Sequence, residues 1–289
     1  MKFKSIFITG GAGYVGTRLV PQLLKNGYKV TVYDILYYTS KYLPNNNKNL
    51  KIIQGDIRDS NKLEIECANH DIFLNLACIS NDASFELDEE LSKSVNFDSF
   101  EPMVIAAKNA GIKRFIYASS SSVYGVSDQP EVKEDHPLVP VSLYNKYKGM
   151  CEPLLFKHQS ENFVCVTIRP ATLCGYAPRQ RMDLSVNILT NHAVNNKKIK
   201  VFGGEQLRPN LHIQDMCDLY KLLLDIDDKK IAGQIFNAGY ENQSILDIAN
   251  IVKKVVEQKY PEMGEISIEK SSSDDIRSYH INSDKIKDI

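Results

Sequence analysis

The sequence predicts an α/β protein built on a doubly wound parallel sheet, followed by a smaller mixed α/β region. Three observations support this fold. Short apolar strands alternate with helical segments five times over in the first half, as in parallel βαβ units with right-handed crossovers. The strand expected at Asp71 to Leu76 is apolar without interruption, which is typical of a strand buried on both faces. A glycine-rich turn follows the first strand directly.

The glycine-rich turn, Thr9 to Gly16, lies between an apolar strand at Phe3 to Ile8 and a helix that contains Leu19 to Leu24. Gly10 and Gly13 permit a tight turn and bring backbone amides close to a pyrophosphate at the helix N-terminus. Gly16 is expected to let the helix pack closely on the strand. Glycine turns without a ligand are common, so this pattern alone is a weak signal.

The second strand strengthens that signal. It runs from Lys29 to Tyr33 and ends at Asp34, which stands 18 positions after Gly16. An acid about 20 residues after the glycine turn binds the adenosine ribose hydroxyls in dinucleotide-binding proteins. Its carboxylate would repel a ribose phosphate, so the two features together predict NAD rather than NADP. The alternative is a solvated aspartate at a strand end.

The remaining elements continue the alternation and then become less regular. The further strands are expected at 50–53, 71–76, 114–118 and 163–168, and later at 198–202, 234–237 and 266–268. The further helices are expected at 60–68 with Ser60 as N-cap, at 86–110 with a kink or new start at Pro102, at 142–160 with Ser142 as N-cap, and at 184–194, 213–225 and 245–259. We therefore divide the chain into 1–169 and 170–289, with the two parts interleaved.

Composition limits the classes of partner. The 289 residues carry 35 Lys and Arg against 36 Asp and Glu, a net charge of −1. No basic stripe is present, so neither a nucleic acid nor a membrane surface is expected as a partner. No apolar run approaches the ~20 residues of a membrane span, and the first strand is too short for a secretory signal.

The six cysteines are scattered and predict neither a metal site nor a redox dithiol. None is two residues from another, which is the separation that such sites usually show. Most of them lie within apolar runs and are expected in the core. The protein is therefore expected in the reducing cytoplasm, with no bound metal.

Tyr144 and Lys148 form a candidate acid-base unit. They stand four residues apart in an expected helix, so their side chains leave the same face one turn apart. An ammonium nearby would favour the phenolate and lower the pKa of the tyrosine from about 10 towards neutrality. The same spacing is frequent on solvated helices, and other motifs are needed to choose between the two interpretations.

Several motifs in the expected order supply that support. The chain resembles the extended short-chain dehydrogenase/reductases, specifically the NAD-dependent nucleotide-sugar epimerases and dehydratases, from Phe3 to about Ile281. The resemblance implies a Rossmann-type NAD-binding part. It is carried by the glycine turn at 9–16, by Gly55-Asp56-Ile57-Arg58, Asn75-Leu76-Ala77, Ser94-Val95-Asn96 and Ser119 to Gly125, and by Tyr144-x-x-x-Lys148. The usual small residues inside the last motif are Asn145 and Tyr147 here.

The resemblance implies roles for individual residues. It makes Ser120, Tyr144 and Lys148 catalytic: Tyr144 takes the proton of a sugar hydroxyl, Ser120 bonds the same oxygen, and Lys148 also holds the nicotinamide ribose. The implied NAD-binding residues are Gly10, Gly13, Tyr14, Val15, Gly16, Asp34, Asp56, Ile57, Leu76, Ala77, Asn96, Tyr144 and Lys148.

The substrate implied by the resemblance is a nucleotide-diphosphate sugar. Arg208, in a segment similar to the family's Arg-x-x-x-His-Val-x-Asp, and Arg277 would contact the diphosphate, and Asn187 would meet the same phosphates. Guanidinium groups bind phosphate oxygens in a bidentate manner, which a nearly neutral protein needs locally. Ser120, Ser121 and Ser122 are expected to contact the sugar. Exposed loop arginines remain the alternative for Arg208 and Arg277.

The type of reaction is less well specified. In the family's 4,6-dehydratases an aspartate and a glutamate follow the catalytic hydroxyl residue, whereas Ser121 and Ser122 stand there in this chain. Dehydration is therefore disfavoured. A 4-epimerase is preferred on family frequency alone, with a 4-dehydrogenase that releases a ketosugar as the alternative. A non-enzymatic NAD-binding regulator or scaffold is disfavoured because such proteins typically lose the tyrosine or the lysine.

The family commonly dimerises through two long helices, which leads us to expect a homodimer here. The corresponding helices are 86–110 and 142–160, and their candidate interface residues are Leu91, Val95, Met150 and Leu154. A core-facing stripe would show the same pattern. The chain ends soon after Ile281, where family members usually continue for another strand and helix, so either a truncated product or a lean substrate region is expected.

Overall fold

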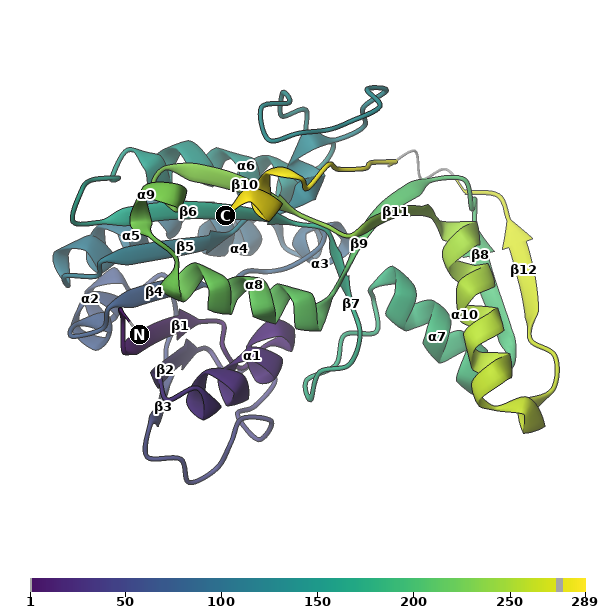
Figure 1. Ribbon diagram of the computed structural model, residues 1–289, viewed down its shortest axis with the longest axis horizontal. Coiled ribbons are helices and arrows are strands. Elements are labelled where there is room, and N and C mark those ends of the chain that lie inside the picture. The colour runs from purple at the N-terminus through teal and green to yellow at the C-terminus, as the bar shows by residue number, and fades with distance from the viewer. Residues whose placement is uncertain (1, 274–277) are drawn as a thin grey trace.

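The computed structural model describes residues 2–273 and 278–289. The described chain folds into a large lobe around a seven-stranded sheet and a smaller lobe, at the right of Figure 1, that contains α7, α10, β8 and β12. The expected doubly wound parallel sheet with a smaller mixed α/β region is confirmed.

All neighbours in the main sheet are parallel, in the order β10-β6-β5-β4-β1-β2-β3. Its strands are β1 (Ser5–Thr9), β2 (Lys29–Asp34), β3 (Leu50–Gln54), β4 (Ile72–Asn75), β5 (Arg114–Ala118), β6 (Val164–Pro170) and β10 (Gln234–Ala238). Most of their residues are buried, as expected for strands covered on both faces.

Helices cover both faces of this sheet. Because successive strand residues point to opposite faces, Ile6 and Ile8 of β1 join one hydrophobic cluster and Phe7 joins another. The first cluster is covered by α1 (Tyr14–Lys25) and α8 (Ile213–Asp225), which pack on each other. The second cluster is covered by α2 (Ser60–Cys67), α5 (Phe100–Asn109) and α6 (Leu143–Phe156).

The strand order reverses between β1 and β4, because β2 and β3 continue on one side and β5, β6 and β10 on the other. We call the carboxyl ends of β1 and β4 the switch point. Here Thr9 Oγ1 donates to Asn75 Oδ1 at 2.8 Å, and the Leu76 amide donates to the Thr9 carbonyl at 3.0 Å. Ligands of open α/β sheets bind at such a point.

The glycine turn passes directly over the switch point. Gly10 has φ +72°, and a Cβ atom built on it would lie 2.6 Å from the Ala77 amide nitrogen. A Cβ atom on Gly16 would lie 2.2 Å from the Gly11 carbonyl oxygen. The sequence led us to expect that Gly16 lets the helix pack on the strand, but in the structure Gly16 packs against the turn itself. Gly11 instead packs on a strand, because it faces Val32 of β2.

The second part of the chain contributes to both lobes. β10 and α8 complete the main sheet and its cover, while β8 (Lys198–Phe202) pairs with β12 (Ser267–Ser271) in the smaller lobe under α7 (Ser185–Asn196) and α10 (Ile245–Lys259). A three-stranded sheet of β7 (Thr172–Cys174), β9 (Leu207–His212) and β11 (Glu241–Ser244) joins the lobes, as Figure 1 shows. The division at 169/170 stays a proposal.

Two local predictions are wrong. The helix expected at 86–110 is divided further than predicted, into α3 (Asp82–Glu86), α4 (Glu89–Lys93), a π-helical turn at Ser94–Asp98 and α5. The new helical start expected at Pro102 is confirmed, because Pro102 lies within the first turn of α5, where a proline is tolerated. Asp59, not Ser60, caps α2: its side chain accepts a hydrogen bond from the Lys62 amide. Ser142 caps α6 as expected.

The short elements complete the description. They are α9 (Asp228–Ile231) and 3₁₀ turns at Ser121–Tyr124, Pro261–Met263 and Lys285–Asp288. Within residues 2–273 and 278–289, no helix combines the length and apolar character needed to cross a bilayer. Cys67, Cys151, Cys165 and Cys217 are buried, which confirms that most cysteines lie in the core.

Replacing Gly10 by alanine tests the contact at the switch point. Gly10 and Gly264 share φ +72°, but a Cβ atom on Gly264 would meet nothing within 4 Å. Both variants place an alanine at positive φ, which is strained. Only Gly10→Ala also overpacks its surroundings, so its free energy of unfolding should be lower than that of Gly264→Ala by ~1–3 kcal/mol. Urea denaturation followed by circular dichroism measures the difference. Equal losses for the two variants would contradict the contact.

Candidate active site

The glycine turn leaves donors at the start of α1. Gly13 is the N-cap, no side chain caps the helix, and Tyr14, Val15 and Gly16 form its first turn. The first amides of a helix have no partner within the helix, and together with the helix dipole they attract an anion. The close backbone approach at Gly10 and Gly16 supplies the shape that a pyrophosphate needs at this position.

Asp34 lies beside this turn at the end of β2. Its Oδ2 accepts a hydrogen bond from the Ala12 amide at 3.0 Å and its Oδ1 accepts one from the Leu36 amide at 2.8 Å. These bonds fix the half-buried carboxylate next to the turn. A carboxylate at this place suits ribose hydroxyls and disfavours a ribose phosphate.

Asp56 and Ile57 follow β3, the neighbour of β2. Arg58 forks onto the Asp56 carboxylate with Nε–Oδ1 and Nε–Oδ2 distances of 3.0 Å, and this hydrogen bonding lowers the pKa of Asp56. The Tyr33 hydroxyl donates to the Asp56 carbonyl at 3.0 Å, and Ile57 is buried. The segment is therefore held rigidly at the same edge of the sheet as Asp34.

Asn96 supports the chain that leaves β4 through Leu76 and Ala77. Its Oδ1 accepts from the Ile79 amide and its Nδ2 donates to the Ile79 carbonyl, both at 2.8 Å. The residue stands in the π-helical turn, a feature often found at functional sites. In this structure Asn96 thus fixes the backbone beside the expected cofactor position.

Three of the four serines after β5, Ser120 to Ser122, differ in their surroundings. Ser121 is buried, whereas the Oγ atoms of Ser120 and Ser122 lie 2.6 Å apart and Ser122 Oγ donates to Asn145 Oδ1. Asn145 is one of the two residues that replace the family's small residues inside the Tyr-x-x-x-Lys motif. Its amide fixes the Ser120–Ser122 hydroxyl pair next to α6.

Tyr144 and Lys148 lie on α6 as expected, but the pKa of Tyr144 is shifted in the direction opposite to our prediction. Burial raises the pKa of Tyr144, and the neighbouring Cys78 and Asp82 raise it further. The Tyr144 side chain is half-buried, whereas Lys148 is buried and its Nζ donates to the Ala118 carbonyl at 2.7 Å. In this protein, desolvation of the phenol outweighs the effect that we expected from the ammonium.

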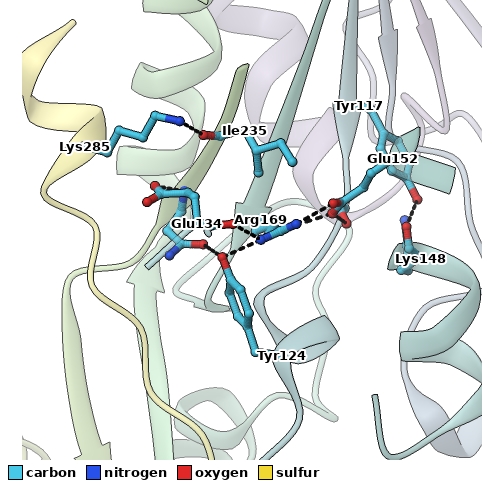
Figure 2. A network of polar contacts seen from close by, with 10 residues as sticks. Tyr117, Tyr124, Glu134, Lys148, Glu152, Arg169, Ile235 and Lys285 are labelled. Atoms are coloured by element: carbon cyan, nitrogen blue, oxygen red, sulfur yellow. Dashed lines mark hydrogen bonds and ion pairs between the residues drawn. The ribbon is translucent and has the colours of Figure 1, made fainter. Parts of the chain in front are cut away.

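A buried ion pair fixes α6 against the sheet. Arg169 of β6 binds Glu152 of α6 through Nε–Oε1 at 3.0 Å and Nη2–Oε2 at 2.6 Å, and each residue is at most 3% exposed. Ser119 Oγ donates to the same Glu152 carboxylate at 2.6 Å. As Figure 2 shows, the carboxylate and the guanidinium face each other in the interior, close to Tyr117 and the helix that carries Lys148.

The other side of Arg169 reaches β10. Its Nη1 donates to the Tyr124 hydroxyl at 2.6 Å and to the Glu134 carbonyl at 3.0 Å (Figure 2). Tyr124 donates in turn to Asn237 Oδ1 at 2.7 Å, and burial raises the pKa of Tyr124 to about 12, so it remains a donor at neutral pH. The network thus joins β6, α6 and the serine turn to β10.

Asn187 of α7 connects the smaller lobe to the glycine turn. Its Nδ2 donates to the Tyr14 hydroxyl at 3.2 Å and to the Arg181 carbonyl at 2.9 Å, and its Oδ1 accepts from the Gly175 amide at 2.9 Å. The Tyr14 hydroxyl also donates to the Gly175 carbonyl at 2.7 Å. Asn187 therefore organises the segment between β7 and α7.

Arg208 lies half-buried on β9, with its guanidinium 5.2 Å from the centre of the Tyr279 ring. On the same two elements as Asn187 and Arg208, Ser185 Oγ and Asn210 Oδ1 are buried without a hydrogen-bond partner in the described structure. Arg277, the second predicted phosphate ligand, lies outside the described residues. Within these residues, no group of His, Cys, Asp or Glu is arranged as metal ligands.

Sequence reasoning missed the residues that act at long range. No motif in the sequence predicted a role for Glu152, Arg169 or Asn237. A charged residue at the end of an apolar strand, as at Arg169, does indicate that a buried partner is required. Arg181 was noted only as part of a loop cluster. Its partner Asp183 is close in sequence, but nothing in the sequence places the pair beside Tyr144.

The comparisons with known proteins agree with this geometry. A family model described as "NAD dependent epimerase/dehydratase family" matches residues 6–239. A low-salt glycan biosynthesis protein, Agl12 of Haloferax volcanii, is 28% identical over 242 residues, which cover 81% of this chain and 76% of that protein. The dTDP-D-glucose 4,6-dehydratase of Bos taurus is 29% identical over 88% of this chain and 74% of its own length.

Solved structures with a similar fold also include proteins in complex with nucleotide sugars. UDP-N-acetylglucosamine 4-epimerase from Methanobrevibacter ruminantium M1, in complex with UDP-N-acetylmuramic acid, has a TM-score of 0.86 and 26% identity, over 99% of this chain and 92% of that one. MoeE5 in complex with UDP-glucuronic acid and NAD has a TM-score of 0.81 and 25% identity, over 98% and 91%.

Loss of the buried ion pair should destabilise the protein strongly. Glu152→Gln leaves the Arg169 guanidinium buried without its counter-charge, so the free energy of unfolding should fall by ~3–5 kcal/mol. Glu131→Gln is the matched control, because Glu131 pairs with Lys133 where both side chains are more than half exposed, and it should cost less than ~1 kcal/mol. Urea denaturation measures both, and a mild effect of Glu152→Gln would show that the pair does not anchor α6.

Proposed function

We propose, from the premise that this chain belongs to the NAD-dependent epimerase/dehydratase family, that it oxidises the 4-hydroxyl of a nucleotide-diphosphate sugar and acts as a sugar epimerase. The chain is an NAD-dependent enzyme of the extended short-chain dehydrogenase/reductase type. The observation that supports the proposal best is the placement of Tyr144 and Lys148 on one face of α6, beside the serine turn that follows β5.

The proposed chemistry divides proton and hydride transfer between the protein and its cofactor. NAD, when bound, accepts the hydride from the sugar carbon and can return it. Tyr144, as the phenolate, removes the hydroxyl proton, and a general base positioned in this way typically contributes ~10²–10⁴-fold to the rate. Ser120 holds the same oxygen, while Ser122 and Asn145 hold Ser120. Lys148 orients the nicotinamide ribose.

The cofactor-binding residues proposed for this chain lie around the switch point. The pyrophosphate is assigned to the amides of the α1 first turn, Tyr14 to Gly16. Gly10 and Gly13, whose own amides donate to the Tyr33 and Gly10 carbonyls, shape the turn that leads into this helix. Asp34 is assigned to the adenosine ribose. The adenine is assigned to Asp56 and Ile57, and the chain beside the cofactor to Leu76, Ala77 and Asn96.

The diphosphate of the substrate is assigned to α7 and β9. Arg208 supplies a guanidinium, and Asn187 and the N-terminus of α7, which has no side-chain cap, lie on the neighbouring element. The buried unpaired oxygens of Ser185 and Asn210 indicate that polar partners are missing in this region when no ligand is bound. Arg277 remains a further proposed contact. The sugar is assigned to Ser120, Ser121 and Ser122.

The side chains at 121 and 122 argue against dehydration, even though dTDP-D-glucose 4,6-dehydratase is among the relatives. Elimination of water needs an acid and a base next to the catalytic hydroxyl residue, and serine is neither at neutral pH. Contacts of Ser121 and Ser122 with the sugar would therefore be hydrogen bonds and would not replace that acid and base.

The proposal is tested by offering the purified protein, with NAD, a panel of UDP-, dTDP- and GDP-sugars. Inversion of one sugar without net NADH, seen by NMR and by near-ultraviolet absorbance, is the expected result. NADP in place of NAD should not support turnover, because Asp34 repels the ribose phosphate. Accumulation of NADH together with a ketosugar would instead identify a 4-dehydrogenase.

Tyr144→Phe should lower kcat by at least ~10²-fold because the proton acceptor is lost. Tyr147→Phe is its control: Tyr147 lies on the same helix, but its ring stacks on Phe85 and Phe97, so the loss of its hydroxyl should leave kcat within about twofold. Full activity of Tyr144→Phe would rule out the assigned mechanism. Tyr144 would then no longer be an argument against a cofactor-binding regulator or scaffold.

We also propose a homodimer formed through the α4–α5 segment and α6. Leu91 and Met150 are 42% and 40% exposed, while Val95 and Leu154 lie partly buried against the core beside them. The double variant Leu91→Glu/Met150→Glu should therefore be monomeric in light scattering while the wild type is dimeric. A monomeric wild type would refute this interface. The cytoplasmic location remains a prediction.

A further inference from the structure

The segment between β7 and α7 passes beside the start of α1, to which the cofactor pyrophosphate is assigned (Figure 1). The Arg179 amide donates to Thr17 Oγ1 at 3.2 Å, although the two residues are 162 positions apart. Thr17 is buried, and its hydroxyl donates to the Tyr14 carbonyl at 3.3 Å. Further along the segment, Asp183 Oδ2 accepts from Asn81 Nδ2 at 2.6 Å. The backbone of Arg179 is therefore fixed at the pyrophosphate end of the expected cofactor site.

The loop after β2 supplies a second part of the same surface. Asp34, the proposed ribose ligand, accepts from the Leu36 amide, and the Leu36 carbonyl accepts from the Thr39 amide at 2.9 Å. Leu36 and Thr39 have φ +60° and +70°, which is rare for residues with bulky or branched side chains. Such a conformation persists only where the surroundings hold it, as the Asp34 carboxylate does here. The same aspartate that is assigned to the ribose thus sets the course of the loop that carries Tyr38.

Arg179 and Tyr38 join these two segments. The Arg179 Cζ lies 3.6 Å from the centre of the Tyr38 ring, and the Tyr37 ring packs edge-on against that ring at 5.0 Å between centres. A guanidinium stacked in this way uses its face for the ring, while the N–H groups along its edge can still bind phosphate oxygens in the plane. The Arg179 side chain therefore extends from the pyrophosphate end of the site to the loop that follows the ribose ligand.

The charge of Arg179 lacks a counter-charge from the protein. Other arginines bind a carboxylate directly, namely Arg58, Arg114, Arg169 and Arg181. Within residues 2–273 and 278–289, the Arg179 guanidinium makes neither an ion pair nor a side-chain hydrogen bond, and it contacts the Tyr38 ring. It also lies on the segment bound to the start of α1, and a cation is unfavourable at the positive end of a helix dipole. An anion bound between the two would satisfy both.

We propose that Arg179 is a further NAD-binding residue: stacked on Tyr38, its guanidinium binds the pyrophosphate together with the amides of α1 and clasps the ADP half of the cofactor. This inference rests on the placement of NAD in the proposed function and is independent of the reaction that follows. Neither residue belongs to the motifs that carry the family resemblance. Because the stack links two separate segments, it should act mainly on the rate at which NAD dissociates.

Cofactor binding tests this without any turnover. NADH binding to the full-length protein is followed by NADH fluorescence, and dissociation is followed by chasing bound NADH with excess NAD. Arg179→Gln should raise the Kd for NADH by ~10-fold or more, mostly through faster dissociation, because a hydrogen bond to a charged group is typically worth that factor. Arg179→Lys keeps the charge but not the planar edge, and its Kd should fall between the two.

Variants of Tyr38 test the stack. Tyr38→Leu should raise the Kd for NADH by ~2–5-fold, the usual worth of an exposed cation–π contact, whereas Tyr38→Phe keeps the ring and should bind as the wild type does. Tyr38 acts through Arg179, so the double variant Arg179→Gln/Tyr38→Leu should bind NADH no more weakly than Arg179→Gln alone. Fully additive losses would contradict the clasp.

The matched control is a second cation–π pair in the same loop. Lys41 Nζ lies 5.0 Å from the centre of the Tyr42 ring, but this pair joins neighbouring residues rather than two segments. Lys41→Gln removes the same charge from an exposed site, so it should change the Kd for NADH by about twofold at most. An equal loss in Lys41→Gln and Arg179→Gln would show a general effect of net charge and overturn the inference.

Competing ligands locate the contact on the cofactor. Arg179→Gln should weaken the displacement of NADH by ADP-ribose but not its displacement by adenosine, which has no phosphate. Weaker binding of both ligands would indicate a general distortion of the site, and unchanged binding of both would exclude the contact, so either result overturns the inference. Circular dichroism of each variant confirms that the fold is retained.

Asp34→Ala separates this inference from the placement on which it rests. Loss of the proposed ribose ligand should weaken the binding of ADP-ribose and adenosine alike. If Asp34→Ala binds both as the wild type does, the proposed placement of NAD fails and the inference fails with it. If Asp34→Ala weakens both while Arg179→Gln changes neither, the placement stands and only the role of Arg179 is refuted.

Discussion

The buried ion pair between Arg169 and Glu152 is the interaction on which the arrangement of the site depends. It joins the last strand of the first chain part to α6, and through Ser119 and Tyr124 it reaches both ends of the serine turn. Neither charge can be solvated, so each is stable only with the other in place, and α6 can adopt one register against β6. Tyr144 and Lys148 are therefore positioned by a contact at Glu152, one turn beyond Lys148.

The same burial that fixes the helix creates an electrostatic problem at Tyr144. A phenol removed from water holds its proton more tightly, and here Cys78 and Asp82 add to that effect. A cation must compensate if the tyrosine is to act as a base. The Lys148 amine, one turn further along α6, donates to the Ala118 carbonyl in this structure. The charges that fix α6, Arg169 and Glu152, are therefore separate from the groups that shift the pKa of Tyr144.

Local signals in the sequence predicted the parts of the fold that local physics determines. These parts are the alternation of strands and helices, the glycine turn, Asp34 at the end of β2 and the Ser142 cap. Each follows from the hydrophobic period, a positive φ angle or capping chemistry within a few residues. The division of the expected helix at 86–110 was missed because Asp88 begins α4 as its N-cap and Asn96 holds the Ile79 backbone, through contacts that the hydrophobic period does not reveal. The pairs Arg169–Glu152 and Asn81–Asp183 join distant segments, so no local pattern contains them.

The interleaving of the two chain parts explains how those distant pairs can form reliably. β10 and α8 belong to the main sheet, and the segment that carries Arg181 runs between β6 and α8, so it is anchored in the large lobe at both ends. Asn187 fastens it to Tyr14 on the glycine turn, and Asp183 fastens it to Asn81 after β4. The loop is therefore attached to the two strands that meet at the switch point.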